Sequence, residues 1–246
     1  MFKDHFSSVS KGYAAYRPGY PDRLVEVLAE VSPGRDLALD CGCGTGQLSV
    51  LLASRFEAVV ATDASAAQIQ QAERHNRVTY RTALAEESGL PEGSVDLITV
   101  AQAAHWFDLP KFYEEVRRVA RPGAALALIT YGVLHVEGDV DAAVQHFYYD
   151  VVGPYWPFER RLVENGYRDL PFPFEERPVP TLAMESWWDL KDLLGYVGTW
   201  SAVKEAEKSL GTNPVLEFEE RLRQEWGDPT TRRRVTWPLS LRIGNV

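Results

Sequence analysis

The feature that most constrains this chain is a glycine-rich turn placed directly after a short apolar run. Residues 37–47 read LALDCGCGTGQ, and Asp40 stands near the end of the apolar run. The apolar run is typical of a buried parallel strand, and glycine gives the turn backbone freedom without side-chain bulk. A helix is predicted at residues 48–56, with its N-terminus directed at the turn. The pattern predicts a backbone cradle for a nucleotide-like ligand, and its alternate glycines are Gly42, Gly44 and Gly46.

A second apolar run, at residues 58–62, ends in Asp63, seventeen residues beyond Gly46. The tip of the second strand of a β-α-β unit is where one carboxylate can accept hydrogen bonds from two ribose hydroxyls side by side. A glycine turn by itself could be only a tight crossover between a strand and a helix. Asp63 at this position favours the ligand-binding interpretation.

Two classes of cofactor are held on such a unit, and the glycine spacing separates them. Dinucleotide-binding domains usually carry G-x-G-x-x-G, with the pyrophosphate seated on the helix N-terminus. Counted from Gly42, the sixth position here is Gln47 instead of glycine. The order D-x-G-x-G-x-G, led by Asp40, resembles motif one of class I S-adenosylmethionine-dependent methyltransferases. An oxidoreductase that binds NAD on the same unit is the alternative from another class, and a cofactor-binding regulator without turnover is a third.

Length and charge narrow the class of protein. With 246 residues the chain fits one α/β domain with some decoration. Its net charge of −9 argues against a broad phosphate-binding face, since nucleic-acid-binding domains carry a basic stripe. We therefore expect a small-molecule substrate, no nucleic-acid partner, and a monomer or homodimer.

The cysteines and the lengths of the apolar runs indicate the cellular compartment of the protein. Cys41 and Cys43 both lie in the glycine turn, where they are too close for an ordinary disulfide and lack further ligands spaced for zinc. The N-terminus lacks a secretory pattern, and the longest apolar stretch, residues 124–129, is far shorter than a bilayer span. We expect a cytoplasmic protein with no metal and no membrane partner.

Apolar runs and helical patterns alternate along the first half of the chain. This alternation implies an α/β fold with a doubly wound, mostly parallel sheet, whose ligands bind at the carboxyl ends of the strands. With the class I resemblance, the expected sheet has seven strands and is Rossmann-like. Strands are predicted at residues 37–41, 58–62, 78–82, 95–100 and 124–131. Helices are predicted at residues 22–31, 48–56, 65–75 and 109–120.

The pattern changes after Gly132. A helix at residues 139–151 and a stretch rich in proline and aromatics at 153–180 predict a helical cap inserted after the fifth strand, and such a cap would carry substrate specificity. The expected organisation is a single domain with a lid at about residues 1–21, a core at about 22–132 and 181–246, and the cap at about 133–180. In the last part we expect a helix at 186–208 broken near Gly195 and Gly198, a helix at 213–226 and a closing strand at 234–243.

Four segments point to one group within this family. They are YAAYRPGYP at residues 13–21, VAQAAHWFD at 100–108, VGTWS at 197–201 and RVTWPL at 234–239. All four resemble segments of the trans-aconitate-methyltransferase-like group in the small-molecule branch of the class I methyltransferases. The resemblance covers most of the chain apart from the cap, and it implies S-adenosyl-L-methionine as the cofactor.

The resemblance also implies cofactor contacts at particular positions. The three glycines would line the methionine portion, Asp40 would lie near the cofactor's amino group, and Asp63 would take the ribose hydroxyls. Ala85 and Glu86 follow the third strand, where the family places adenine contacts, although Glu86 could instead be a solvated acid. Gln102 would stand beside the transferable methyl or the cofactor carboxylate. A lid over the cofactor would be formed by Tyr13, Tyr16 and Arg17.

The acceptor is expected beside the end of the fourth strand. His105 is the candidate to act as a base or to position the acceptor, and Arg17 could match a carboxylate through its planar guanidinium. As an alternative, His105 could have only an ordinary packing role, and Trp200 could belong to the hydrophobic core of the cap. The further side chains expected at the substrate are Trp106, Tyr131 and Trp200.

The chemistry expected of such a site is simple. The sulfonium of S-adenosylmethionine is already activated, so the protein has to align a nucleophile in line with the methyl group and exclude water. A carboxylate acceptor is ionised at neutral pH and needs only a positive group to bind it, whereas a phenol or amine would need a base. The glycine cradle and the group resemblance therefore predict methyl transfer to a small metabolite, for which a carboxylic acid is one candidate, with C-methylation in quinone-type biosynthesis as the alternative within the family.

Overall fold

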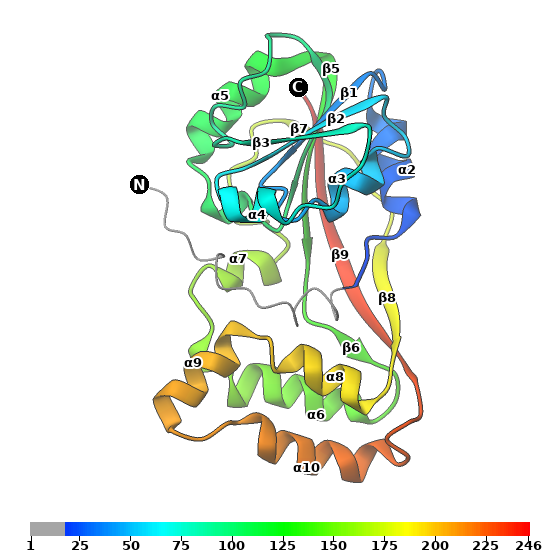
Figure 1. Cartoon of the computed structure of the whole chain (residues 1–246), viewed down its shortest axis with the longest axis vertical. Coiled ribbons are helices and arrows are strands. Elements are labelled where there is room, and N and C mark those ends of the chain that lie inside the picture. The colour runs from blue at the N-terminus through cyan, green and yellow to red at the C-terminus, as the bar shows by residue number, and fades with distance from the viewer. Residues whose placement is uncertain (1–17) are drawn as a thin grey trace.

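The computed structural model describes residues 18–246, and strands and helices alternate through its first half (Figure 1). All five strands and four helices predicted there are present. The strands are β1 (Leu37–Cys41), β2 (Ala58–Asp63), β3 (Val78–Thr82), β4 (Val95–Ala101) and β5 (Ala120–Tyr131). The helices are α2 (Asp22–Val31), α3 (Gln47–Leu52), α4 (Ala66–Gln70) and α5 (Leu109–Val119), with a 3-10 turn, η1, at Ala104–Trp106.

Helices α3 and α4 are shorter than the sequence predicts, because other contacts take the place of the next helical turn. After α3, the Ser54 hydroxyl donates to the Leu51 carbonyl at 2.7 Å, which satisfies a carbonyl at the helix end. After α4, the backbone N–H of Glu73 donates to the Thr45 carbonyl at 3.0 Å and the Tyr80 hydroxyl donates to the Glu73 carbonyl at 2.7 Å. The segment beyond α4 is therefore tied to the glycine turn and to β3 instead of continuing as helix.

The second half contains short strands and a group of helices. Residues 186–188, predicted as the start of a helix, belong instead to a strand that pairs antiparallel with residues 233–235. The helix predicted from 186 to 208 is in fact two helices, separated at residues 198–200. The elements are β6 (His135–Val136), α6 (Val140–His146), the π-helical turn η2 (Phe147–Val151), the 3-10 turn η3 (Gly153–Tyr155), α7 (Arg160–Glu164), β7 (Glu175–Glu176), β8 (Leu182–Trp188), α8 (Leu190–Val197), α9 (Ser201–Leu210), α10 (Val215–Trp226) and β9 (Arg233–Asn245).

The sheet has the order β3-β2-β1-β4-β5-β9-β6, with β7 and β8 also paired to β9. Strands β1 to β5 are parallel to one another, and β9 is antiparallel to β5. The doubly wound, mostly parallel α/β class is therefore confirmed. The described residues form nine strands where seven were expected, because β8 and the two-residue strands β6 and β7 all pair with β9.

Helices cover both faces of the sheet. Along β5, Ala125, Ala127 and Ile129 face a hydrophobic cluster that includes the buried side chains of α2 and α3. Leu126 and Leu128 face a second cluster that includes the buried side chains of α5. This alternation is what a strand buried on both faces requires.

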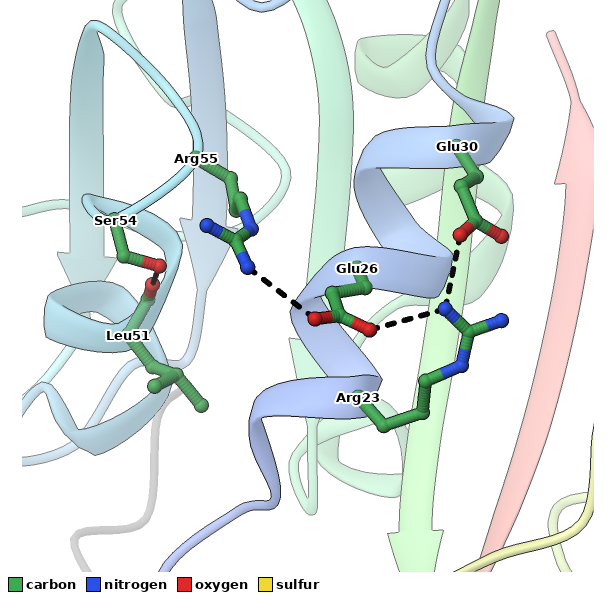
Figure 2. Close-up of polar contacts among 6 residues, drawn as sticks. All are labelled: Arg23, Glu26, Glu30, Leu51, Ser54 and Arg55. Atoms are coloured by element: carbon green, nitrogen blue, oxygen red, sulfur yellow. Dashed lines mark hydrogen bonds and ion pairs between the residues drawn. The ribbon is translucent and has the colours of Figure 1, made fainter.

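Helix α2 is also linked to the end of α3 by charged side chains at the surface (Figure 2). Arg55 contacts Glu26 at 3.3 Å, and Arg23 contacts Glu26 at 3.0 Å and Glu30 at 2.9 Å. Because these side chains are substantially exposed, the pairs contribute little to stability. The apolar face of α2 against the sheet provides most of its attachment.

Helices α6, α8, α9 and α10 form a separate layer beyond the end of the sheet toward which β5 runs (Figure 1). Phe147 stacks on Phe218 of α10 with ring centroids 4.1 Å apart, which joins the end of α6 to α10. Residues 190–226, which we expected to lie in the core segment 181–246, therefore pack with α6. We propose that the cap comprises this whole group of helices and not only residues 133–180. Within the part of the chain that the structure describes, none of the helices combines the length and the apolar character needed to span a bilayer.

Candidate active site

The glycine turn joins the carboxyl end of β1 to the start of α3. Its backbone is held by a hydrogen bond from the Cys43 N–H to the Thr62 carbonyl at 3.0 Å and by the bond between Glu73 and Thr45. All three glycines have positive φ, a region that other residues rarely adopt. The values are +67° for Gly42, +55° for Gly44 and +85° for Gly46.

The three glycines differ in what surrounds them. A Cβ on Gly42 would lie 2.5 Å from the Cβ of Ala103, and one on Gly46 would run into the ring of Tyr80. At Gly44 the nearest atom is Oε1 of Gln68, at 3.9 Å. Gly42 and Gly46 are therefore required by packing against neighbouring segments, whereas Gly44 leaves room for a ligand.

Asp63, at the tip of β2, is turned toward the glycine turn. Its Oδ2 accepts a hydrogen bond from the Gly44 N–H at 2.9 Å, and its Oδ1 accepts one from the Ser65 N–H at 2.8 Å. A carboxylate offers about four acceptor positions, so each oxygen can accept one bond more. The geometry fits a residue that shapes the turn and can also bind a pair of ribose hydroxyls.

Asp40 lies in β1, directly before the glycine turn, with its side chain directed into the protein. Its side chain is 1% exposed, and it accepts hydrogen bonds from the Ser49 hydroxyl at 2.6 Å and the Thr99 hydroxyl at 2.8 Å. Burial raises the pKa of Asp40 to about 6, because the charged form is poorly solvated there. Asp40 links β1 to α3 and β4 beneath the turn.

Two segments border the turn at the ends of β3 and β4. Gln102 directly follows β4 with a φ of +60°, and its side-chain amide donates to the Tyr131 carbonyl at 3.2 Å. Such strain in a residue other than glycine is often found at functional sites. Ala85 is buried, and Glu86 accepts a hydrogen bond from the Asp108 N–H at 2.8 Å. Glu86 is thus engaged at the start of α5 and is not simply a solvated acid.

His105 lies in η1, immediately beyond Gln102. Its Nδ1 is 2.7 Å from the hydroxyl of Tyr167, a buried residue that also has a positive φ, of +61°. Burial, with a smaller contribution from the positive charge of Arg160, lowers the pKa of His105 to about 4. The imidazole is therefore neutral at physiological pH. Trp106, 38% exposed, has its ring centroid 4.7 Å from that of His105.

A cluster of aromatic rings in the cap surrounds Arg160. The guanidinium carbon lies 4.9 Å from the centre of the Trp156 ring and 5.6 Å from that of Tyr148. Trp200, predicted as a substrate residue, is 8% exposed and packs on both rings at 5.7 and 5.3 Å. Trp200 therefore packs within the core of the cap, which is the alternative that we gave for it from the sequence. Tyr131, also predicted at the substrate, is likewise buried in the hydrophobic core.

Sequence reasoning did not find Arg160, Tyr148 or Tyr167, and it considered Trp156, like Trp200, chiefly as part of the cap core. The segment that contains Arg160 has no recognised motif, and the one sequence feature that could have indicated these residues is the spacing of four between Trp156 and Arg160. The predicted lid residues Tyr13, Tyr16 and Arg17 lie outside the described residues. Among residues 18–246, no group of three or more histidine, cysteine or acidic side chains is placed to hold a metal ion, and Cys41 and Cys43 are free thiols.

The order of the sheet, the glycine turn after β1 and the acid at the tip of β2 together define a class I methyltransferase fold. The residues present fit S-adenosylmethionine, because Gly44 leaves room beside the turn and Asp63 keeps free acceptor positions.

Comparison with known proteins agrees with this class. Residues 39–128 match the protein family described as methyltransferase domain. A Dictyostelium discoideum protein named as a methyltransferase is 40% identical over 225 residues, which is 90% of this chain and 86% of that protein. The solved structure of an Anaeromyxobacter dehalogenans protein described as a type II methyltransferase is 52% identical, with a TM-score of 0.90, and the match covers 93% of this chain and 97% of that one. A Saccharomyces cerevisiae protein named as an S-adenosylmethionine-dependent methyltransferase is 29% identical over 131 residues, 50% of this chain and 45% of that protein.

The chain therefore belongs to the methyltransferase family. It is an enzyme, and S-adenosyl-L-methionine is its cofactor. The alternatives of an NAD-binding oxidoreductase and of a regulator without turnover are set aside.

Proposed function

We propose that the enzyme transfers the methyl group of S-adenosylmethionine to a carboxylate oxygen of a small metabolite, as in the trans-aconitate-methyltransferase-like group. The observation that carries this proposal is the His105–Tyr167 pair beside the end of β4. When bound, the cofactor supplies a methyl group on a sulfonium, which is already electrophilic. The protein has to hold the acceptor oxygen in line with that methyl group and keep water away.

The pKa of His105 supports a carboxylate acceptor. A base whose conjugate acid has a pKa of about 4 removes a proton from a phenol very poorly, since a phenol has a pKa of about 10. A carboxylate is ionised at neutral pH and has no proton to lose. We therefore assign His105 to positioning the acceptor. The same consideration disfavours C-methylation of a quinone-type ring, which also needs the acceptor to lose a proton.

The cofactor is proposed to lie against Gly44, with its ribose hydroxyls on Asp63, its adenine beside the backbone of Ala85 and Glu86, and its methionine end near Gln102. Closure by Tyr13, Tyr16 and Arg17 remains a proposal from the sequence, as do a monomeric or homodimeric state and a cytoplasmic location. For Arg17→Ala we predict lost turnover with the fold intact, checked by activity and by circular dichroism.

The proposal is tested by incubating the enzyme with S-adenosylmethionine and a panel of mono-, di- and tricarboxylates, phenols and amines, and measuring the release of S-adenosylhomocysteine. We expect turnover with a carboxylate and a product that alkali hydrolyses to the parent acid, as a methyl ester must. Turnover confined to phenols, amines or carbon nucleophiles would contradict the proposal.

A further inference from the structure

Arg160, the first residue of α7, is held in a fixed orientation. Its side chain is 24% exposed, and its Nε donates a hydrogen bond to the Tyr148 hydroxyl at 2.7 Å. That hydroxyl in turn donates to Oε1 of Glu164 at 2.5 Å, and the same oxygen lies 3.7 Å from the arginine Nε. These contacts occupy only one edge of the guanidinium. Within residues 18–246, its two terminal amino groups have no hydrogen-bond partner.

The rings around Arg160 favour an anion at that free edge. The guanidinium carbon lies 4.9 Å from the centre of the Trp156 ring and 5.6 Å from that of Tyr148, so both rings contact the charged group while only its Nε is hydrogen-bonded in the described part of the chain. A planar guanidinium with unbonded N–H groups can bind a carboxylate with two parallel hydrogen bonds. Glu164 offsets part of the positive charge, but it approaches from the Nε side, at a distance too long for a hydrogen bond.

Trp156 supplies a second donor without a partner. Its indole Nε1 is buried, and it donates to no acceptor among the described residues. A buried donor in this state is unfavourable, so its persistence calls for an explanation, of which an oxygen of a bound ligand is one. Arg160 and Trp156 are in contact, so one carboxylate could satisfy donors on both.

The charge of Arg160 also acts on the candidate site of methyl transfer. It contributes to the lowering of the pKa of His105, and it acts in the same direction on the pKa of Tyr167, against the larger effect of burial. The guanidinium is therefore close enough to the His105–Tyr167 pair to influence it.

We propose that Arg160 and Trp156 form the subsite that binds the carboxylate of the methyl acceptor and thereby select acidic substrates. This inference rests on the proposed function. It assigns to the cap a specific role, the recognition of the acceptor, while the sheet edge holds the cofactor.

The test compares four variants of the full-length enzyme with the carboxylate that the wild type turns over fastest. Arg160→Gln removes the charge, Arg160→Lys keeps it without the planar fork, and Trp156→Phe removes only the indole N–H. The control is Arg161→Gln, because Arg161 is exposed and its guanidinium lies over the ring of Phe158. Cofactor affinity is measured by calorimetry, and carboxylate affinity by titrating the enzyme saturated with S-adenosylhomocysteine.

For Arg160→Gln we expect the KM and the dissociation constant of the carboxylate to rise about 10- to 100-fold, the range for loss of a charge-assisted hydrogen bond. Arg160→Lys should recover part of the loss, Trp156→Phe should raise KM several-fold, and Arg161→Gln should behave as wild type. Affinity for the cofactor should stay unchanged in all four. A wild-type KM in Arg160→Gln would overturn the inference.

If Arg160→Gln does not fold, Tyr148→Phe serves in its place, because it removes the hydroxyl that orients the arginine Nε and keeps the ring. Unchanged KM values in both Tyr148→Phe and Trp156→Phe would then overturn the inference. The two proposals fail in different ways. If the wild type methylates only phenols or amines, both are wrong; if it methylates carboxylates and the variants do so with unchanged KM, only the subsite is wrong.

Discussion

The carboxylate of Asp63 and the backbone N–H of Gly44 are joined by a hydrogen bond of 2.9 Å, which connects the tip of β2 to the middle of the glycine turn. The other carboxylate oxygen accepts from the Ser65 N–H, at the start of α4. The residue proposed to bind the ribose therefore also fixes the backbone on which the cofactor is proposed to lie. Binding and local order at this edge of the sheet depend on the same side chain.

Asp63→Ala should lower the affinity for S-adenosylmethionine about 10- to 100-fold, since both the charged acceptor for the ribose and the order of the turn are lost. Calorimetric titration measures this, and the free energy of unfolding should fall by about 1–3 kcal/mol. The matched control is Glu57→Ala, an exposed acid just before the opposite end of β2. Equal cofactor affinity in the two variants would remove Asp63 from the binding site.

Gly44→Ala should separate backbone strain from occlusion of the cofactor position. Gly44 has a φ of +55° and Gly93 one of +59°, and neither would place a Cβ in contact closer than 3.9 Å. Alanine in this region costs about 1–2 kcal/mol at either site, so the two variants should lose similar stability in urea unfolding. Only Gly44→Ala should also lose cofactor affinity, because its methyl group would occupy the space beside the turn. Wild-type affinity in Gly44→Ala would show that the cofactor lies elsewhere.

The parallel part of the sheet could be predicted from the sequence because β1, β2, β4 and β5 contain apolar runs that end at recognisable turns. What the sequence did not show depends on contacts between distant segments. The early end of α4 follows from the bond between Tyr80 and Glu73, and β8 exists because residues 182–188 pair with residues 233–239. Neither contact leaves a periodic pattern in the chain.

The same reason separates the candidate site residues that motif spacing indicates from those that it does not. Asp63 and Gly44 follow directly from motif spacing, whereas the inward position of Asp40 depends on hydroxyls supplied by Ser49 and Thr99. The surroundings of Arg160 are assembled from η2, the residue after η3 and the residue before α9, and only folding brings these together.

Asp40→Asn should make the enzyme more stable relative to wild type as the pH rises. The folded-state pKa of Asp40 is about 6, above its ordinary value of 3.8, so its contribution favours folding below pH 3.8 and is lost as the pH rises through 6. Asparagine can still partner both neighbouring hydroxyls and carries no charge. Between pH 3 and pH 8 the difference in unfolding free energy should shift by about 3 kcal/mol in favour of the variant, measured by urea unfolding at each pH. A difference that does not change with pH would contradict the assigned environment of Asp40.

His105→Gln should slow turnover by less than about 10-fold, because a positioning residue contributes less than a general base, whose removal costs about 100- to 10,000-fold. The pH dependence provides the second readout. The folded-state pKa of His105, about 4, is below its ordinary value of 6.5. As the pH falls from 6.5 to 4, the unfolded state takes up a proton before the folded state does, so His105 lowers the free energy of unfolding in this range. Above pH 6.5 His105 has no such effect on stability. The stability of His105→Gln should therefore fall less than that of wild type in this window. Asp40 acts in the opposite sense at overlapping pH, so the comparison is made in the Asp40→Asn background. If turnover instead slows by about 100-fold or more, and the wild-type rate shows an ionisation near the ordinary histidine pKa, His105 is a base and a phenolic acceptor is favoured.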